Sequence, residues 1–186
     1  ERMQFEKLVN EILRIFTKPM DIINFESVST EAGGMIEDGI KLSRISKNVV
    51  VKVPLTEQGL LACQELARKN IRVNVTLCFS SAQALLAAKS GAYFISPMVG
   101  RLDDQNDNGM RLVEEIRKIY TNYKFNTQIL VASVRNVQHV TEAALIGADV
   151  CTVPYNVFEK LFMHELTDIG LARFLDDWKK AKLKIK

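Results

Sequence analysis

Apolar positions follow two periods along the chain, and the two periods alternate. Residues 5–16 carry apolar side chains at helical spacing, which predicts an opening helix that ends before Pro19. Short apolar or alternating runs follow, and they predict strands at residues 20–28, 48–53, 72–78, 93–98, 128–133 and 149–153. Amphipathic segments lie between them, at residues 56–69, 80–89, 108–123 and 137–146. This order of strands and helices predicts an α/β fold with a parallel sheet.

The parallel sheet is expected to belong to a barrel. Neither GxGxxG nor GxxxxGK[ST] occurs, which disfavours a nucleotide-binding doubly wound sheet. Gly91 and Gly147 each follow a helical segment and precede a strand, where a left-handed helix end is expected. An eight-unit barrel seldom has fewer than ~200 residues, and only six strands are predicted here. We therefore expect a barrel of which this chain supplies part.

Lys52 lies inside an apolar strand, near its end. A strand in a parallel sheet is buried on both faces, and an ammonium group buried without a partner is unfavourable. One interpretation is that the stem of Lys52 packs while its amine reaches solvent. The other is that Lys52 is a desolvated nucleophile toward a carbonyl group, since desolvation favours the neutral amine.

Polar side chains share one face near the ends of several predicted strands. Side chains alternate along a strand, so residues two apart lie on the same face. This places Asn24 with Glu26, Asn74 with Thr76, and Ser96 with Met98. Parallel barrels build their active sites at the carboxyl ends of their strands. The pattern therefore predicts a polar site at this end.

Two arginines follow neighbouring strands. Arg101 comes three residues after Met98, and Arg135 comes two residues after Ser133. Two guanidinium groups with a hydroxyl suit a phosphate monoester, which offers several acceptor oxygens. The alternative for each arginine is a surface salt bridge.

Composition narrows the class of protein. The chain has 186 residues, 47% hydrophobic and 25% charged, as expected of one soluble globular domain. Its apolar runs are too short to span a membrane. Its net charge of +3 is spread along the chain, with a basic cluster only at residues 179–186, so we expect no nucleic-acid partner.

The remaining polar clusters are expected to have no chemical role. Cys63, Cys78 and Cys151 lack metal-ligand spacing and indicate buried free thiols in a reducing compartment, hence a cytoplasmic protein without structural zinc or a signal peptide. Asp103, Asp104 and Asp107 lack the EF-hand pattern and indicate a solvated loop. His139 and His164 are near no predicted nucleophile.

Several ordered motifs resemble the transaldolase family, in particular its small single-domain subfamily, which includes fructose-6-phosphate aldolases. They are VVVKVPLTEQGL from Val49, NVTLCFSSAQALLAAKSGA from Asn74, SPMVGRLDD from Ser96, VASVRN from Val131 and the tail LTDIGLARFLDDW. The resemblance covers essentially the whole chain. It implies a (β/α)8 TIM barrel with an extra carboxyl-terminal helix.

The resemblance also implies roles for the polar residues at the strand ends. Lys52 would form a Schiff base with the ketose donor, and Glu26 and Thr76 would position the water of imine formation. Asn74 and Ser96 would contact donor hydroxyls, and Arg101, Ser133 and Arg135 would bind phosphate. Met98 would lie in the donor site, where relatives carry an aromatic residue.

The implied activity is that of a transaldolase of the pentose phosphate pathway. The enzyme would move a dihydroxyacetone unit from sedoheptulose 7-phosphate or fructose 6-phosphate to an aldose phosphate, with no metal or organic cofactor. Two alternatives stay open: a fructose-6-phosphate aldolase that releases dihydroxyacetone, and a catalytically silent barrel that binds sugar phosphates.

The resemblance sets expectations for chain organisation as well. The first two strands of the family barrel, with an acid/base aspartate and a donor-binding asparagine, have no match, so we expect roughly 30 further amino-terminal residues. Residues 1–166 are expected to form the barrel domain. Residues 167–186 are expected to form a helix that packs on a neighbouring subunit of a homo-oligomer, a pentamer or decamer.

Overall fold

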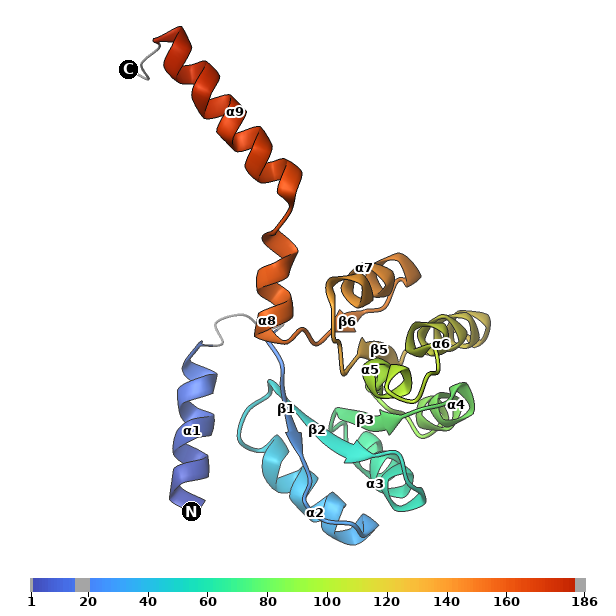
Figure 1. Cartoon of the computed structure of the whole chain (residues 1–186). Helices are drawn as coiled ribbons and strands as arrows, with labels where there is room; N and C mark the ends of the chain where they lie inside the picture. The colour runs from blue at the N-terminus through green and yellow to red at the C-terminus, as the bar shows by residue number, and fades with distance from the viewer. Residues whose placement is uncertain (1, 16–20, 183–186) are drawn as a thin grey trace.

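The computed structural model describes the backbone of residues 2–15 and 21–182, and every side chain within them except those of residues 2–6 and 10. Its strands and helices alternate along the chain (Figure 1). The strands are β1 (Ile23–Glu26), β2 (Val49–Pro54), β3 (Val73–Cys78), β4 (Phe94–Pro97), β5 (Gln128–Val131) and β6 (Val150–Cys151). The helices are α1 (Arg2–Ile15), α2 (Ala32–Ser43), α3 (Glu57–Arg68), α4 (Ser81–Lys89), α5 (Val99–Asp103), α6 (Gly109–Tyr123), α7 (Val137–Ile146), α8 (Tyr155–Phe158), the 3-10 helix η1 (Glu159–Phe162) and α9 (Glu165–Ala181).

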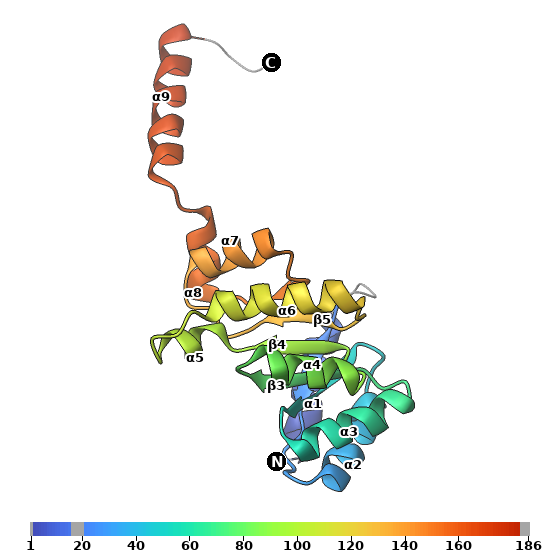
Figure 2. The same cartoon turned by 90° about the vertical axis from the view of Figure 1, so that its right-hand side faces the viewer.

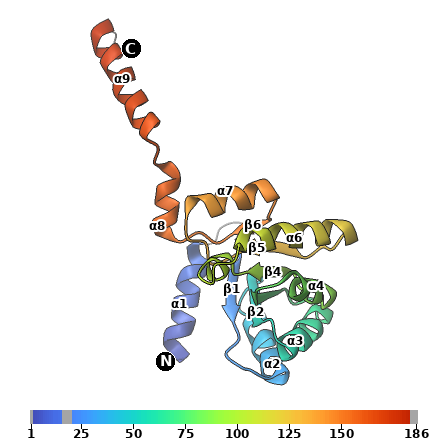
Figure 3. The ribbon, with the colours of Figure 1, turned by 45° about the vertical axis from the view of Figure 1, so that its right-hand side comes forward.

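The strands form one parallel sheet in chain order. Each strand pairs with the next, from β1 at one edge to β6 at the other. The sheet curls like part of a barrel wall, and helices α2, α3, α4 and α6 lie around its outside (Figure 3). The α/β fold with a parallel sheet is confirmed. Within the described residues the sheet is open, and the expectation of further strands stays a prediction.

Helix boundaries follow from local chemistry. The backbone N–H groups of residues 59, 83, 111 and 139 donate to the side chains of Thr56, Ser80, Asn108 and Asn136, which cap α3, α4, α6 and α7. Gly91 and Gly147 follow α4 and α7 with φ of 81°. That left-handed conformation suits glycine, so both expected helix ends are confirmed.

Apolar residues occupy both faces of the sheet in different ways. On the outer face Val51, Val53, Val75 and Ile129 are fully buried and belong to the main core with the helices. On the inner, concave face a smaller cluster joins Val50, Phe94 and Leu130. This division explains the continuous apolar runs of the strands.

Several elements differ from the sequence prediction: most strands are shorter than predicted, and the pattern does not predict α2. Residues 99–103 form the short helix α5, which includes Asp103 of the predicted solvated loop, because five residues are too few to show a helical period. The last strand covers only Val150–Cys151 rather than residues 149–153. Phe16, Pro19 and Met20, which bound the first predicted elements, lie outside the described residues.

Helix α9 extends away from the sheet in all three views (Figure 1, Figure 2, Figure 3). It carries exposed Leu171, Phe174, Leu175 and Trp178. None of the described helices has the length and apolarity needed to cross a membrane.

Candidate functional site

The concave face places the predicted polar residues side by side. In the parallel ladder Glu26 is opposite Lys52, and Lys52 is opposite Asn74. Directly paired residues in adjacent strands point to the same face of a sheet. Thr76 and Ser96 lie on that face by the same parity. The face predicted from the sequence is therefore the face that the structure forms.

Lys52 and Glu26 form an ion pair on this face. The Lys52 Nζ lies 3.5 Å from Glu26 Oε2, and the two side chains are 29% and 55% exposed. The flanking Val51 and Val53 are fully buried on the other side of the strand. The buried strand therefore holds the backbone of Lys52, while its amine lies on the concave face next to the Glu26 carboxylate. The partial exposure of Lys52 fits a stem that packs in the strand while the amine reaches the concave face, and its role as a nucleophile stays a prediction.

A chain of hydrogen bonds connects three strands beside Lys52. Ser96 Oγ donates to Asn74 Oδ1 over 2.7 Å, and Asn74 Nδ2 donates to Asn24 Oδ1 over 3.0 Å. Asn74 and Ser96 are only 2% and 1% exposed. Buried polar groups joined in this way hold fixed orientations. The network lies beside Lys52, because Asn74 is paired with Lys52 in the ladder.

Thr76 and Met98 meet above this network. Thr76 Oγ1 lies 3.9 Å from Met98 Sδ, and Thr76 is buried. Met98 follows the last residue of β4 and pairs with Ala132 after β5. It therefore stands where the upper ends of β3, β4 and β5 converge. Its thioether is a flexible apolar group that adapts to the shape of its neighbours.

The predicted phosphate residues gather around α5. The N–H of Gly100 on α5 donates to the backbone oxygen of Ser133, over 3.0 Å. Ser133 has φ of 61°, a left-handed turn that ends the extended segment of β5. Arg135 follows it, and its Nη2 donates to Asp104 Oδ2 over 2.7 Å. Arg101 lies on α5 itself and is exposed.

Sequence reasoning missed the polar contacts that support Arg135. The sequence predicts Asp103 in a solvated loop, but its Oδ2 lies 2.9 Å from Nε2 of the buried His139. The exposed Arg135–Asp104 ion pair, in contrast, is the surface salt bridge that the sequence leaves open as the alternative for this arginine. These partners lie 31 or more residues apart along the chain, so no short motif joins them. A helical period in residues 99–103 would have been the signal, and the helix is too short to give one.

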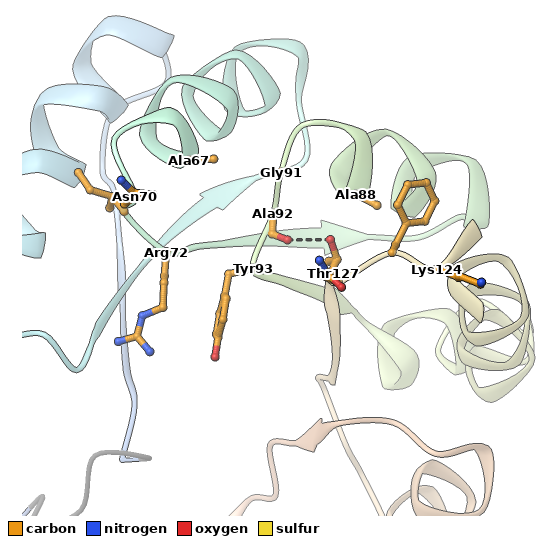
Figure 4. Close-up of a pocket in the computed structure, with 12 residues that line it drawn as sticks. Ala67, Asn70, Arg72, Ala88, Gly91, Ala92, Tyr93, Lys124 and Thr127 are labelled. Carbon is orange, nitrogen blue, oxygen red and sulfur yellow. Dashed lines mark hydrogen bonds between the residues drawn. The ribbon is translucent and has the colours of Figure 1, made fainter. Parts of the chain in front are cut away.

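A separate hollow lies at the amino ends of β3, β4 and β5. It measures about 550 Å³ and is lined by Arg72, Tyr93, Lys124 and Thr127 among others (Figure 4). None of the predicted site residues lines it. The carboxyl ends of α3, α4 and α6 border it, and their partial negative charge disfavours a phosphate there. The candidate site is therefore the other end of the sheet.

The described residues offer no obvious metal centre. Within residues 2–15 and 21–182 no three His, Cys, Asp or Glu side chains are grouped so as to hold a metal ion. The groups of the candidate site are instead an amine, a carboxylate, amides, hydroxyls and guanidinium groups. This set can form an imine with a carbonyl compound and can bind hydroxyls and an anion.

Comparison with known families identifies related proteins over most of the chain. The model of the family described as transaldolase/fructose-6-phosphate aldolase matches residues 3–185. A probable transaldolase of Aquifex aeolicus is 54% identical over 177 residues, which are 95% of this chain and 80% of that protein. A probable transaldolase of Thermoplasma volcanium is 50% identical over 178 residues, 96% of this chain and 78% of that protein.

Solved structures of more distant proteins share the architecture. A FabK variant from Thermotoga maritima is 18% identical, with a TM-score of 0.53 over 80% of this chain and 47% of that one. A mandelate oxidase variant is 12% identical, with a TM-score of 0.52 over 70% of this chain and 49% of that one. At such identities the likeness concerns the fold alone.

Proposed function

Since the chain belongs to the transaldolase/fructose-6-phosphate aldolase family, we propose that it transfers a dihydroxyacetone unit between sugar phosphates through a Schiff base on Lys52. The observation that carries this proposal is the placement of Lys52 on the concave face, 3.5 Å from Glu26 and beside the Asn74–Ser96 network. An amine next to a carboxylate and a set of hydroxyl-binding groups suits a polyhydroxy carbonyl substrate.

The first half of the reaction attaches the donor. Glu26 accepts a proton from the Lys52 ammonium, and the neutral amine attacks the C2 carbonyl of the ketose. The resulting carbinolamine loses its hydroxyl group as water, with the proton returned from Glu26, and leaves an iminium ion. Thr76, near the top of the same face, holds the water that enters or leaves.

The second half breaks and remakes a carbon–carbon bond. Glu26, a carboxylate again after the loss of water, accepts the proton of the C4 hydroxyl. C4 departs as the aldehyde carbon of an aldose phosphate, and the electron pair of the C3–C4 bond moves toward the iminium nitrogen. The three-carbon enamine stays on Lys52 until C3 attacks the aldehyde of another aldose phosphate. Hydrolysis then frees the new ketose, so the lysine itself serves as the electron sink.

Binding groups divide the donor between them. Asn74 and Ser96 face the hydroxyls of the three-carbon unit from β3 and β4, and Met98 limits the space above them. Ser133, Arg101 and Arg135 bind the phosphate at the upper ends of β4 and β5. Charge-assisted hydrogen bonds from guanidinium groups give this end of the substrate its orientation.

Reductive trapping tests the proposal. We expect incubation with fructose 6-phosphate and borohydride to attach a reduced three-carbon unit to the peptide that contains Lys52, as measured by mass spectrometry. Lys52→Ala and Lys52→Arg should both abolish the adduct and lower turnover at least ~10³-fold, because neither side chain supplies a neutral amine. Lys47→Ala, which removes an exposed lysine outside the concave face, is the matched control.

The products distinguish the alternatives. With erythrose 4-phosphate as acceptor, transfer should exceed the release of free dihydroxyacetone. Dominant release without acceptor would assign the chain to the aldolase activity. Phosphate binding without any adduct at Lys52 would instead indicate a silent sugar-phosphate binder.

A further inference from the structure

His139 is a buried side chain at the junction of α5, α6 and α7, outside the groups that face the substrate. Its side chain is 9% exposed. Its backbone N–H donates to Asn136 Oδ1, the cap of α7, over 2.8 Å. The cap of the helix is therefore complete without the ring, and the ring is available for another task.

Both ring nitrogens of His139 have a partner. The backbone N–H of Arg135 donates to Nδ1 over 3.3 Å, while Nε2 lies 2.9 Å from Asp103 Oδ2. A nitrogen that accepts a hydrogen bond carries no proton, and a carboxylate can only accept. These partners assign the ring proton to Nε2 and leave Nδ1 as the acceptor for Arg135.

Asp103 fixes the other end of this link. Its Oδ1 accepts a hydrogen bond from the N–H of Gly109, the first residue of α6, over 3.0 Å. The carboxylate thus ties the end of α5 to the start of α6 while its second oxygen holds the imidazole. Asp103 and His139 together connect three helices to the backbone of Arg135.

The side chain of Arg135 is confined at two further points. A Cβ added to Gly100 would lie 2.6 Å from both Cγ and Nε of Arg135, so the arginine stem passes directly over this glycine. The guanidinium Nη2 contacts Asp104, the residue after Asp103. Backbone, stem and tip of Arg135 are therefore each held by a different group.

We propose that His139, oriented by Asp103, is a positioning residue that sets Arg135 for phosphate recognition. The inference rests on the proposed function insofar as Arg135 binds the substrate phosphate. His139 acts through the backbone of Arg135 rather than on the reacting atoms. Its loss should weaken selection for phosphorylated sugars and leave the chemical step at Lys52 intact.

Two amide substitutions separate the contacts of the ring. In His139→Gln the amide nitrogen can occupy the place of Nε2, which keeps a donor toward Asp103 and removes the acceptor for Arg135. In His139→Asn the amide oxygen can occupy the place of Nδ1, which keeps that acceptor. His164→Gln is the matched control, because His164 Nδ1 also accepts from a backbone N–H, that of Leu166, at the start of α9.

The measurements are kcat and KM for fructose 6-phosphate and for unphosphorylated fructose, and the Kd of inorganic phosphate. We expect His139→Gln to raise the KM for fructose 6-phosphate and the Kd of phosphate about fivefold to tenfold, with kcat and the reaction of fructose unchanged. His139→Asn should show a smaller change, and His164→Gln none. Arg135→Ala removes the guanidinium group itself, so its loss of phosphate affinity is the upper limit expected for His139→Gln.

The outcomes separate this inference from the proposed function. Equal losses for both sugars in His139→Gln, or unchanged phosphate affinity, would overturn the positioning role. If His139→Gln does not fold, Asp103→Asn serves instead, and it should raise the same two constants selectively. Failure of wild-type protein to form the Lys52 adduct would reject the proposed function, while the phosphate Kd of the variants would still decide the role of His139.

Discussion

Burial separates the nucleophilic side chains that can react from those that cannot. Cys63 and Cys78 are fully buried, and burial raises the pKa of each thiol to about 12. Cys151 is half-buried, and burial raises its pKa too. The thiolate is the reactive form of cysteine, so these thiols are poor nucleophiles at neutral pH. Lys52 differs because its side chain is 29% exposed on the concave face.

We predict a fixed order of thiol labelling. At pH 8 iodoacetamide should modify Cys151 first and leave Cys63 and Cys78 intact, as read by mass spectrometry of the native protein. Addition of guanidinium chloride should expose all three and serves as the control. Rapid labelling of Cys63 in the folded protein would contradict the burial described here.

The same pKa shifts affect stability at high pH. For Cys63 the pKa in the folded state, about 12, lies above the ordinary value of 9.0, so the folded state retains the proton that the unfolded state loses. The stability contributed by this thiol is present below pH 9.0 and is lost as the pH rises toward about 12. The free energy of unfolding is therefore expected to fall through this range.

Helix α9 has an apolar stripe that its own sheet does not cover. Leu171, Phe174, Leu175 and Trp178 recur at i, i+3, i+4 and i+7, so they lie on one side of the helix. Their exposed fractions run from 37% for Trp178 to 63% for Phe174. An exposed stripe of large apolar residues is typical of a surface that contacts another protein.

We predict that α9 packs on another copy of this chain. Phe174→Glu combined with Trp178→Glu should lower the sedimentation coefficient, because charge on the stripe opposes its burial. Arg173→Glu changes a residue on the opposite side of the same helix and should leave the assembly unchanged. An unaltered assembly in the double variant would rule out this role for α9, and the expected pentamer or decamer stays a prediction.

Sequence patterns predicted which residues lie on the inner face of the sheet, but not the contacts that hold Arg135 in place. The period of two along β2 and β3 fixed the facing of Lys52 and Asn74, because strand parity is independent of tertiary context. Gly91 and Gly147 located two helix ends for an equally local reason. The roles of these residues follow from the family resemblance and not from the strand pattern.

Contacts between elements far apart in the chain could not be predicted from the sequence. Asp103 and His139 lie 36 residues apart, and each has an ordinary surface explanation when considered alone. Residues 155–162 form α8 and η1, which are too short to reveal a period. The secondary structure of such short segments depends on tertiary packing rather than on local sequence preference.

At the scale of the molecule, the sheet has two different kinds of strand. Strands β2, β3, β4 and β5 each pair on both sides, whereas β1 and β6 pair on one side within the described residues. Edge strands present backbone groups that can pair with further strands. This difference is independent of the chemistry of the site.

Hydrogen exchange should reveal the difference. Amides of β1 are predicted to exchange at least ~10-fold faster than those of β3, because opening an edge breaks one ladder rather than two. Mass spectrometry of proteolytic fragments measures both strands in one experiment. Equal protection of β1 and β3 would mean that a further strand, from this polypeptide or another copy, pairs with β1.

The concave face has an apolar layer and a polar layer, which differ in how much buried apolar surface a substitution would remove. The lower layer, Val50, Phe94 and Leu130, is apolar and closed, whereas Glu26 and Met98 lie above it and contribute no fully buried apolar surface. Substitution of the upper residues leaves the lower layer and the outer core in place. Since Glu26 has a role in the proposed proton transfers, Met98 is the residue of the upper layer that a variant library can change while most of its members keep the parent fold.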